Sequence, residues 1–261
     1  ESLAKSLAAN VAPGGLVVEI ASNDGVLQRP LRERGIHCVG VEPARNICEL
    51  AWHDGLDTLN EFFTEETVDK LGPHSADVVV ACNVFAHVPD LRAFTRAMNR
   101  LLKDSGQLVL EVEYLGDIID QVAYGNFYQD HLFYWSLRAL CRFLSSEGLD
   151  VHTVLRVATQ GGSIRVYASK RRLGLGDGYS MLIDETDWTL QTYHDFAQRV
   201  TKAQHQFRST LQKLKEAGAC IAGYGAAAKG VSLLNYCHIG PETLSYIVDD
   251  SPLKTGRFTP G

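Results

Sequence analysis

The sequence of 261 residues is 45% hydrophobic and 21% charged, a composition that is typical of globular proteins and argues against a disordered or fibrous chain. The formal net charge is −6, the lysines and arginines are scattered, and no apolar stretch is long enough to cross a membrane, so we expect no nucleic-acid or membrane partner. The start of the sequence, Glu-Ser-Leu-Ala-Lys, has no signal-peptide pattern, so we expect a cytoplasmic protein. The six cysteines form no Cys-x-x-Cys pair, which predicts reduced cysteines and no metal site.

Short apolar runs alternate with amphipathic stretches in the first half of the chain, a pattern that predicts βαβ units and a parallel sheet. Strands are predicted at residues 16–20, 37–43, 76–83 and 106–113. Helices are predicted between them at residues 26–35, 61–72 and 91–106.

One edge of this sheet is predicted to be antiparallel. After a helix at residues 137–148, two apolar runs at residues 150–159 and 162–170 are separated by Gly161 and Gly162, which is typical of a hairpin. We therefore expect one α/β domain over residues 1–170.

The rest of the chain predicts a second, smaller α/β domain. Glycine-rich residues 171–183 indicate a linker, and apolar residues at helical spacing predict a long helix over residues 187–218, so that residues 171–218 connect the two domains. Residues 219–261 predict a strand, a glycine turn, a helix and a strand, the start of a Rossmann-like domain. Because the chain begins with Glu1 and stops just after a strand and a turn, we expect part of the natural protein to be missing.

The turn after the first predicted strand, Ala-Ser-Asn-Asp-Gly at residues 21–25, is suited to binding a nucleoside. Small residues between a parallel strand and a helix let a ligand approach unpaired N–H groups, and Glu42 at the end of the second strand can accept hydrogen bonds from ribose hydroxyls. Only Gly25 of the dinucleotide pattern Gly-x-Gly-x-x-Gly is present, which favours a nucleoside with an amino-acid tail. The alternative is a plain Rossmann scaffold with a solvated Glu42.

The stretch Glu19-Ile-Ala-Ser-Asn-Asp-Gly25, the pair Glu42-Pro43 and Asn83 together resemble a class I S-adenosylmethionine (SAM) methyltransferase. The resemblance implies a Rossmann-like sheet with an antiparallel edge hairpin, SAM as cofactor, the methionyl part on Glu19 and the turn, the ribose on Glu42, and the adenine on Glu61 and Phe62. The cofactor-binding residues that it implies are Glu19, Ser22, Asn23, Gly25, Glu42, Pro43, Glu61, Phe62 and Asn83.

The segment Tyr-Gln-Asp-His at residues 128–131 contains groups that are suited to acid–base chemistry. A histidine has the right intrinsic pKa for a base near neutrality when a carboxylate orients it, and Asp130 directly precedes His131. His87 follows a neighbouring predicted strand, so two imidazoles can meet at one edge of the sheet. The competing interpretation is a surface loop in which Tyr128 and His131 only pack against nearby aromatic residues.

Nearly the whole chain resembles a narrower family, the sugar C-methyltransferases that act on nucleotide-linked 4-keto deoxysugars in antibiotic and cell-surface glycan pathways. The matching motifs are SNDG, NVFAHVPD, EVEYLGDII, YQDH, GGSIRVYAS and the C-terminal GYGAAAKG with IVDDSPLKTGRFTPG. The family usually has Glu where this chain has Asp130, and it carries an N-terminal zinc domain with four cysteines that has no counterpart in this sequence.

This resemblance implies that His131 removes a proton from the carbon beside the ketone, and that Tyr128 and His87 bind the keto oxygen or ring substituents. Asp130 completes the catalytic set, and Tyr114 would bind the substrate, whose sugar carbon C3 and thymidine diphosphate are implied by the resemblance alone. We expect the enzyme to be a monomer or a dimer.

The C-terminal glycine turn after residue 222 can hold a phosphate, because Gly223 and Gly225 leave the backbone accessible and Lys229 adds a positive charge. The family resemblance assigns these three residues to the diphosphate of the substrate, whereas the residues alone equally allow a structural turn. Asp249 and Asp250 keep an NAD-linked oxidoreductase as a rival. The sequence also allows O- or N-methylation of a small molecule, or a non-catalytic module that binds a nucleotide sugar or SAM.

Overall fold

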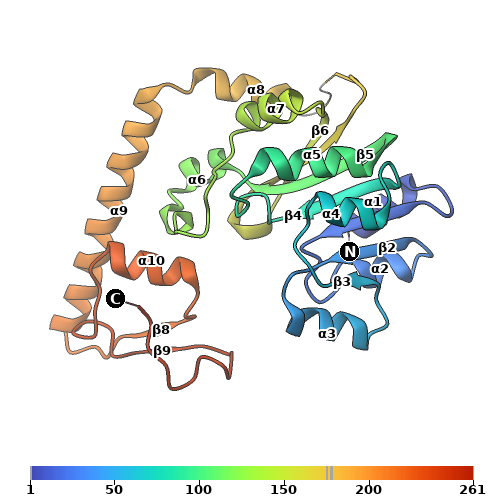
Figure 1. Cartoon of the computed structure of the whole chain (residues 1–261). Helices are drawn as coiled ribbons and strands as arrows, with labels where there is room; N and C mark the ends of the chain where they lie inside the picture. The colour runs from blue at the N-terminus through green and yellow to red at the C-terminus, as the bar shows by residue number, and fades with distance from the viewer. Residues whose placement is uncertain (1, 175, 177–178, 261) are drawn as a thin grey trace. The chain divides into compact units, whose positions relative to one another are not determined.

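The computed structural model describes residues 2–174, 176 and 179–260, and the chain forms two compact units. One comprises the residues up to Leu115 together with Leu132–Thr186, and the other comprises Gly116–His131 together with the residues from Asp187 onward. The expected first domain, residues 1–170, includes Gly116–His131, whereas the structure groups this segment with the C-terminal part of the chain. The elements of each unit are labelled in Figure 1.

A seven-stranded sheet with the order β3-β2-β1-β4-β5-β7-β6 forms the centre of the first unit. Its strands are β1 (Leu16–Ile20), β2 (His37–Val41), β3 (Thr58–Leu59), β4 (Ala76–Cys82), β5 (Leu102–Glu113), β6 (Asp150–Val157) and β7 (Ser163–Ser169). Strands β1 to β5 pair in parallel, whereas β7 runs antiparallel to both β5 and β6. The predicted parallel sheet with an antiparallel edge hairpin is confirmed.

Helices bury the two faces of this sheet. They are α1 (Ser2–Asn10), α2 (Gln28–Arg32), α3 (Arg45–His53), α4 (Glu65–Leu71), α5 (Leu91–Leu101) and α7 (Leu137–Ser146). Leu7 of α1 and Leu31 of α2 belong to one cluster with Val17 and Val80 of the sheet. Val79 points to the other face by strand alternation and is also fully buried, as expected for parallel strands covered on both sides. Figure 1 shows α4 and α5, which contact each other, in front of the sheet.

Helix α5 is shorter than the sequence predicts. It ends at Leu101 because Leu102 is paired with Ala76 and already belongs to β5. The next side chain, Lys103, forms an ion pair with Asp77 of β4 at 2.7 Å. The predicted continuation of this helix to residue 106 is therefore wrong, and the sequence also does not predict α1, α3 or β3.

The segment Gly116–His131 leaves the first unit and returns to it at nearly the same point. The backbone N–H of Leu115 donates a hydrogen bond of 2.9 Å to the carbonyl of Trp135. Between these two residues lie α6 (Leu115–Gln121) and the 3-10 helix η1 (Tyr124–Asn126). The segment thus begins after the carboxyl end of β5, the edge at which doubly wound sheets bind ligands.

The expected linker, residues 171–183, is partly helical. It contains most of α8 (Tyr179–Asp184), which is followed by the 3-10 helix η3 (Glu185–Asp187). Met181 of α8 is buried, so this part of the chain packs against the first unit and does not only connect two domains. Leu175, Asp177 and Gly178 of the expected linker lie outside the described residues.

Glu185 joins three parts of the first unit. Its carboxylate accepts hydrogen bonds from the hydroxyl of Tyr114 (3.1 Å) and from the backbone N–H groups of Leu137 (2.6 Å) and Arg138 (2.7 Å). Leu137 begins α7, where a negative charge interacts favourably with the helix dipole. The side chain is almost fully buried and therefore has a structural role that its sequence neighbourhood does not indicate.

The second unit contains the predicted long helix and the predicted order of strand, turn, helix and strand. Its further elements are α9 (Leu190–Glu216), β8 (Ala222–Tyr224), α10 (Ala228–Tyr236) and β9 (Tyr246–Val248). β8 and β9 pair in parallel, and α10 is the connection between them, as in one βαβ unit (Figure 1). Both predictions are confirmed at the level of the elements.

The Glu185→Ala variant should lose about 2–4 kcal/mol of unfolding free energy, because one hydroxyl and two N–H groups would be buried without this acceptor. Urea unfolding measures this loss. The matched Asp184→Ala variant removes an exposed carboxylate one residue away and should change the stability by less than about 0.5 kcal/mol. Equal effects of the two substitutions would contradict the role of Glu185.

Candidate functional site

The chain turns sharply at the carboxyl end of β1. Ala21 (φ 55°), Asn23 (φ 53°) and Gly25 (φ 91°) all have left-handed backbone conformations, which cost free energy in residues other than glycine. Hydrogen bonds from Ala21 N to Val41 O (2.8 Å) and from Gly25 N to Ser22 O (3.1 Å) hold the turn. Backbone strain of this kind is concentrated at ligand-binding sites.

Two glycines allow the turn to pack closely. A Cβ atom at Gly25 would lie 2.1 Å from Leu56 Cδ1, and a Cβ atom at Gly40 of β2 would lie 2.4 Å from Ser22 Oγ. Both distances are too short for real atoms, so neither position accepts a side chain without rearrangement. Gly40 is missed by the sequence analysis because its role depends on a contact between β2 and the turn after β1.

Four buried side-chain oxygen atoms at the carboxyl edge of the sheet have no hydrogen-bond partner among the described residues: Glu19 Oε2, Ser22 Oγ, Glu61 Oε1 and Asn83 Oδ1. Glu19 and Ser22 lie at the end of β1, Asn83 follows β4 and Glu61 follows β3. Buried polar atoms nearly always have partners, so these four oxygens make this edge the candidate site for a ligand that donates hydrogen bonds. All four residues belong to the predicted cofactor-binding set.

Glu19 is the most strongly perturbed carboxyl group at this edge. Burial, and after it the negative charge of Asp24, raises the pKa of Glu19 to about 8. Burial together with the Glu19 charge also raises the pKa of Cys38, and burial with the charges of Glu111 and Glu19 raises the pKa of Cys82 to about 12. A cationic ligand beside Glu19 would favour its ionised form.

Glu42 is buried at the end of β2 and supports the backbone on both sides. Its Oε2 accepts from Asn23 N (3.1 Å) and its Oε1 from Ala44 N (2.9 Å). Because each carboxylate oxygen can accept two hydrogen bonds, both oxygens keep capacity for ribose hydroxyls. The adjacent Pro43 is exposed, and its carbonyl accepts from Asn60 Nδ2 at 2.9 Å.

Glu61 and Phe62 lie in the loop after β3. The carboxylate of Glu61 forms an ion pair with Lys70, and this hydrogen bond lowers the pKa of Glu61. The ring of Phe62 is 75% exposed, a large apolar surface that a planar ligand could cover.

Tyr128 and His131 are in direct contact on the Gly116–His131 segment. The hydroxyl of Tyr128 lies 2.7 Å from Nε2 of His131, and the two ring centroids are 4.1 Å apart. Both side chains are half-buried, whereas Asp130 is exposed. The structure therefore brings together the predicted base and the predicted phenol.

His87 lies in the loop after β4 and is exposed. The N–H of Leu132 donates a hydrogen bond of 2.8 Å to the carbonyl of Ala86. His87 directly follows Ala86 in the chain and His131 directly precedes Leu132, so this bond fixes the backbone next to both histidines.

Tyr114 is buried at the carboxyl end of β5, and its hydroxyl is used within the fold through the bond to Glu185. The guanidinium of Arg156 lies 5.2 Å from the centre of its ring. A substrate contact through this hydroxyl would have to replace the bond to Glu185.

The C-terminal glycine turn has one position with open space. Gly225 has a φ of 92°, and a Cβ atom there would meet nothing within 4 Å, whereas a Cβ atom at Gly223 would lie 3.2 Å from Ile247 Cγ1. Asp249 accepts from Ala226 N (2.8 Å), and its ion pair with Lys254 is the main cause that lowers the pKa of Asp249 to about 2. This carboxylate is therefore engaged in holding the turn.

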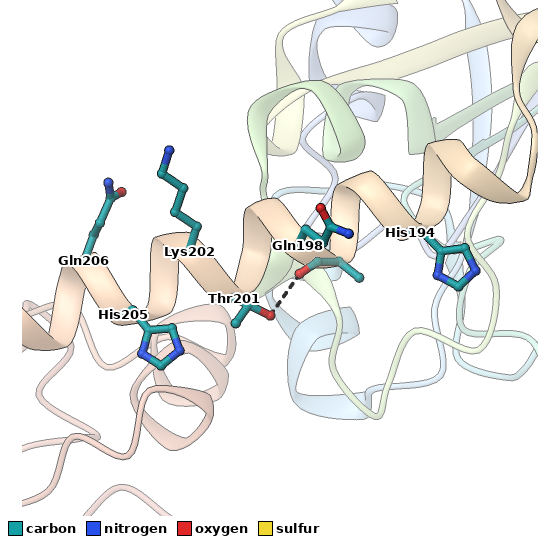
Figure 2. Close-up of a pocket in the computed structure, with 7 residues that line it drawn as sticks. His194, Gln198, Thr201, Lys202, His205 and Gln206 are labelled. Carbon is teal, nitrogen blue, oxygen red and sulfur yellow. Dashed lines mark hydrogen bonds between the residues drawn. The ribbon is translucent and has the colours of Figure 1, made fainter.

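A shallow groove elsewhere in the second unit is lined by His194, Ala197, Gln198, Thr201, Lys202, His205 and Gln206. All seven residues belong to α9, and Figure 2 shows them along this single helix, with Thr201 Oγ1 bonded to the Ala197 carbonyl at 3.0 Å. A groove formed by one helix is an exposed helix face. The groove contains none of the predicted site residues.

A buried ion pair on the sheet is also missed by the sequence analysis. Arg165 of β7 and Glu111 of β5 are paired across the strands, with Nη2 and Oε2 at 2.6 Å, and Thr159 Oγ1 donates to Glu111 Oε1 at 2.7 Å. The signal that could have revealed it is the presence of opposite charges in two apolar runs that are predicted to be neighbouring strands.

The strand order, the antiparallel edge and the ligand-ready edge after β1 define a class I methyltransferase fold. The chain belongs to the methyltransferase-domain family, whose model matches residues 1–154, and the C-methyltransferase C-terminal domain matches residues 158–261. The predicted fold class is confirmed, and SAM as cofactor is confirmed at the level of the family. Within the described residues, no helix is both long and apolar enough to span a membrane.

The chain is 32% identical over 259 residues to the C-methyltransferase NovU of Streptomyces niveus, covering 95% of this chain and 61% of that protein. It thus spans about three fifths of the length of this relative. The ubiquinone biosynthesis O-methyltransferase of Bradyrhizobium diazoefficiens is 32% identical over 100 residues, 37% of this chain and 40% of that protein.

Among solved structures, magnesium protoporphyrin IX methyltransferase of Synechocystis PCC 6803 with bound SAH has a TM-score of 0.52 and 18% identity, covering 64% of this chain and 80% of that one. This likeness concerns the fold alone.

The Glu19→Gln variant should remove a pH dependence of stability. The folded chain keeps the Glu19 proton up to about pH 8, whereas the ordinary pKa of a glutamate is 4.5. Between these pH values the unfolded state therefore binds fewer protons than the folded state. The unfolding free energy thus falls as the pH rises through this window. Urea unfolding of both proteins should show the wild type losing stability relative to Glu19→Gln from about pH 5 to about pH 8.

The exposed Glu33 offers a control. Glu33→Gln should keep the wild-type pH profile, because the side chain lies at the surface and not at the edge that holds Glu19. Profiles for Glu19→Gln that run parallel to the wild type would show that Glu19 is ionised in the folded chain.

Proposed function

We propose that the protein is a SAM-dependent C-methyltransferase that acts on a nucleotide-linked 4-keto deoxysugar, with His131 as the base. The observation that carries the proposal is the 2.7 Å contact between the Tyr128 hydroxyl and the His131 imidazole, on a segment that follows the carboxyl end of β5. The similarity of 95% of the chain to a C-methyltransferase supports it.

The carboxyl edge of β1, β3 and β4 fits SAM. The methionyl part carries an ammonium group that can satisfy Glu19 Oε2, which has no partner among the described residues, and stabilise its charge. Ser22, Asn23 and Gly25 form the turn beside the methionyl part. Glu42 and Pro43 would bind the ribose, and Glu61 and Phe62 would bind the adenine. Asn83 completes the cofactor site at the end of β4. SAM supplies an electrophilic methyl group on a cationic sulfur.

The ketone at C4 of the sugar acidifies the neighbouring C–H bond. The Tyr128 hydroxyl bonds Nε2 of His131 and so orients the imidazole that takes the proton from carbon. Tyr128 and His87 would donate hydrogen bonds to the keto oxygen as charge develops on it. The enolate carbon then forms a bond to the methyl group as the bond between methyl and sulfur breaks, leaving S-adenosylhomocysteine.

The second unit would hold the nucleotide. Gly225 leaves open space in the turn, and Lys229 lies in the first turn of α10, where N–H groups and a cation favour a diphosphate. Gly223 would allow this turn to pack closely, and Asp249 already accepts a hydrogen bond from the backbone of the turn. This use of Asp249 argues against the rival in which it accepts from an NAD ribose. O-methylation is the second candidate, supported by the similarity over 100 residues to an O-methyltransferase.

His131→Asn should lower methylation of a thymidine-diphospho-4-keto-6-deoxyhexose by about 10²–10⁴-fold, because the base is lost, with SAM affinity unchanged. Solvent deuterium should enter the carbon beside the ketone in the wild type and not in the variant. The exposed His194 lines the groove of Figure 2, so His194→Asn serves as the control and should behave as the wild type. Methylation without deuterium entry would indicate O-methylation.

Phe62→Ala should raise the dissociation constant for SAM by about tenfold, which corresponds to the loss of one aromatic stacking contact of about 1.4 kcal/mol. The ring is 75% exposed, so the folded state should keep its melting temperature. Phe258 is 99% exposed, and Phe258→Ala should leave the affinity unchanged in isothermal titration calorimetry. Equal SAM affinity of all three proteins would remove Phe62 from the adenine site.

A further inference from the structure

The segment that carries the candidate base is attached to the second unit by several contacts. The rings of Phe127 and Phe196 of α9 have centroids 6.1 Å apart. Arg199 of α9 donates from Nη2 to the carbonyl of Asp120 at 2.6 Å. These contacts join both ends of the segment Gly116–His131 to one helix.

Helix α10 holds the middle of the segment. The hydroxyl of Tyr124 lies 3.4 Å from Sγ of the fully buried Cys237, and its ring centroid is 5.3 Å from that of Tyr236. Gly125 packs directly on the first turn of α10, since a Cβ atom at Gly125 would lie 3.3 Å from the carbonyl oxygen of Lys229. Tyr124 and Gly125 belong to η1, which ends at Asn126, shortly before Tyr128.

We propose that α9 and α10 position the candidate base: Phe196 and Arg199, with the first turn of α10, hold Tyr128 and His131 in the same compact unit as the glycine turn around Gly225. This inference rests on the proposed function. It adds that the candidate base and the candidate nucleotide-binding turn belong to the same unit, the second one. The segment that carries the base is nevertheless inserted in the sequence of the first unit, between Leu115 and Leu132. Phe196 and Arg199 are positioning residues that act through the segment.

Helix α9 provides its own controls. With about 100° per residue, Phe196, Val200 and Phe207 lie on one face, and Val200 is the buried residue of this face. His194, Gln198, Thr201 and His205 lie on the opposite face, along the exposed groove in Figure 2. Arg199 and Lys202 are therefore suitable as a test residue and its control. Arg199 bonds the segment, whereas Lys202, also a cation, lines the groove.

Hydrogen exchange tests the attachment without any substrate. In the double variant Phe196→Ala/Arg199→Ala, amides of residues 118–131 should exchange at least about tenfold faster, because the segment opens locally when its contacts are removed. Amides of residues 16–26 should be unchanged, and Lys202→Ala should match the wild type throughout. Unchanged exchange of residues 118–131 in the double variant would overturn the inference.

Deuterium entry into the thymidine-diphospho-4-keto-6-deoxyhexose, measured with S-adenosylhomocysteine in place of SAM, tests the consequence. The double variant should lose about 10- to 100-fold in rate at saturating substrate, since small misplacement of a catalytic group has effects of this size, with SAM affinity unchanged. Restoring an apolar side chain at position 196, in Phe196→Leu/Arg199→Ala, should recover part of the rate.

The two proposals fail in different ways. If His131→Asn abolishes deuterium entry but the double variant keeps the wild-type rate, the positioning role of α9 is wrong and the proposed function stands. If His131→Asn has no effect on deuterium entry, His131 is not the base and the proposed function fails, whatever the exchange of residues 118–131 shows.

Discussion

The structure of the site depends on the close contact between the turn after β1 and the strand β2. Gly40 has no side chain, so Ser22 can approach the strand, and Glu42 accepts a hydrogen bond from the N–H of Asn23. This contact holds non-glycine residues in left-handed conformations and leaves the Glu19 and Ser22 oxygens buried without partners in the described structure. Each such atom lowers the unfolding free energy by about 1–3 kcal/mol. A polar ligand that bonds these atoms can restore this stability.

Much of the fold follows from the sequence because its pattern is local. The apolar runs of β1, β4 and β7 and the helical spacing in α9 predict these elements, and Gly161 and Gly162 predict the hairpin. The strand β3 has only two residues, too few to show an alternating pattern. The end of α5 is decided by the pairing of Leu102 with Ala76, a contact between residues far apart in the sequence that no local pattern contains.

The candidate site shows the same division. Glu19, Ser22 and Asn83 are predictable because strand ends and small-residue turns are visible in the sequence. Gly40 and Glu185 are not, since their importance comes from Ser22 Oγ in one case and from Tyr114, Leu137 and Arg138 in the other. The candidate ligand-binding residues follow a motif, whereas the residues that shape the candidate site depend on contacts that only the folded chain creates.

The excursion of Gly116–His131 has a consequence for how the protein is made and can be recombined. This segment is synthesised well before α9 and α10, the helices that it contacts, so the C-terminal unit can form only after both helices have left the ribosome. A chimaera joined between the two units would pair one parent's histidine with the other parent's supporting helices. Exchange of C-terminal halves between related enzymes would therefore also have to include the insert between Leu115 and Leu132.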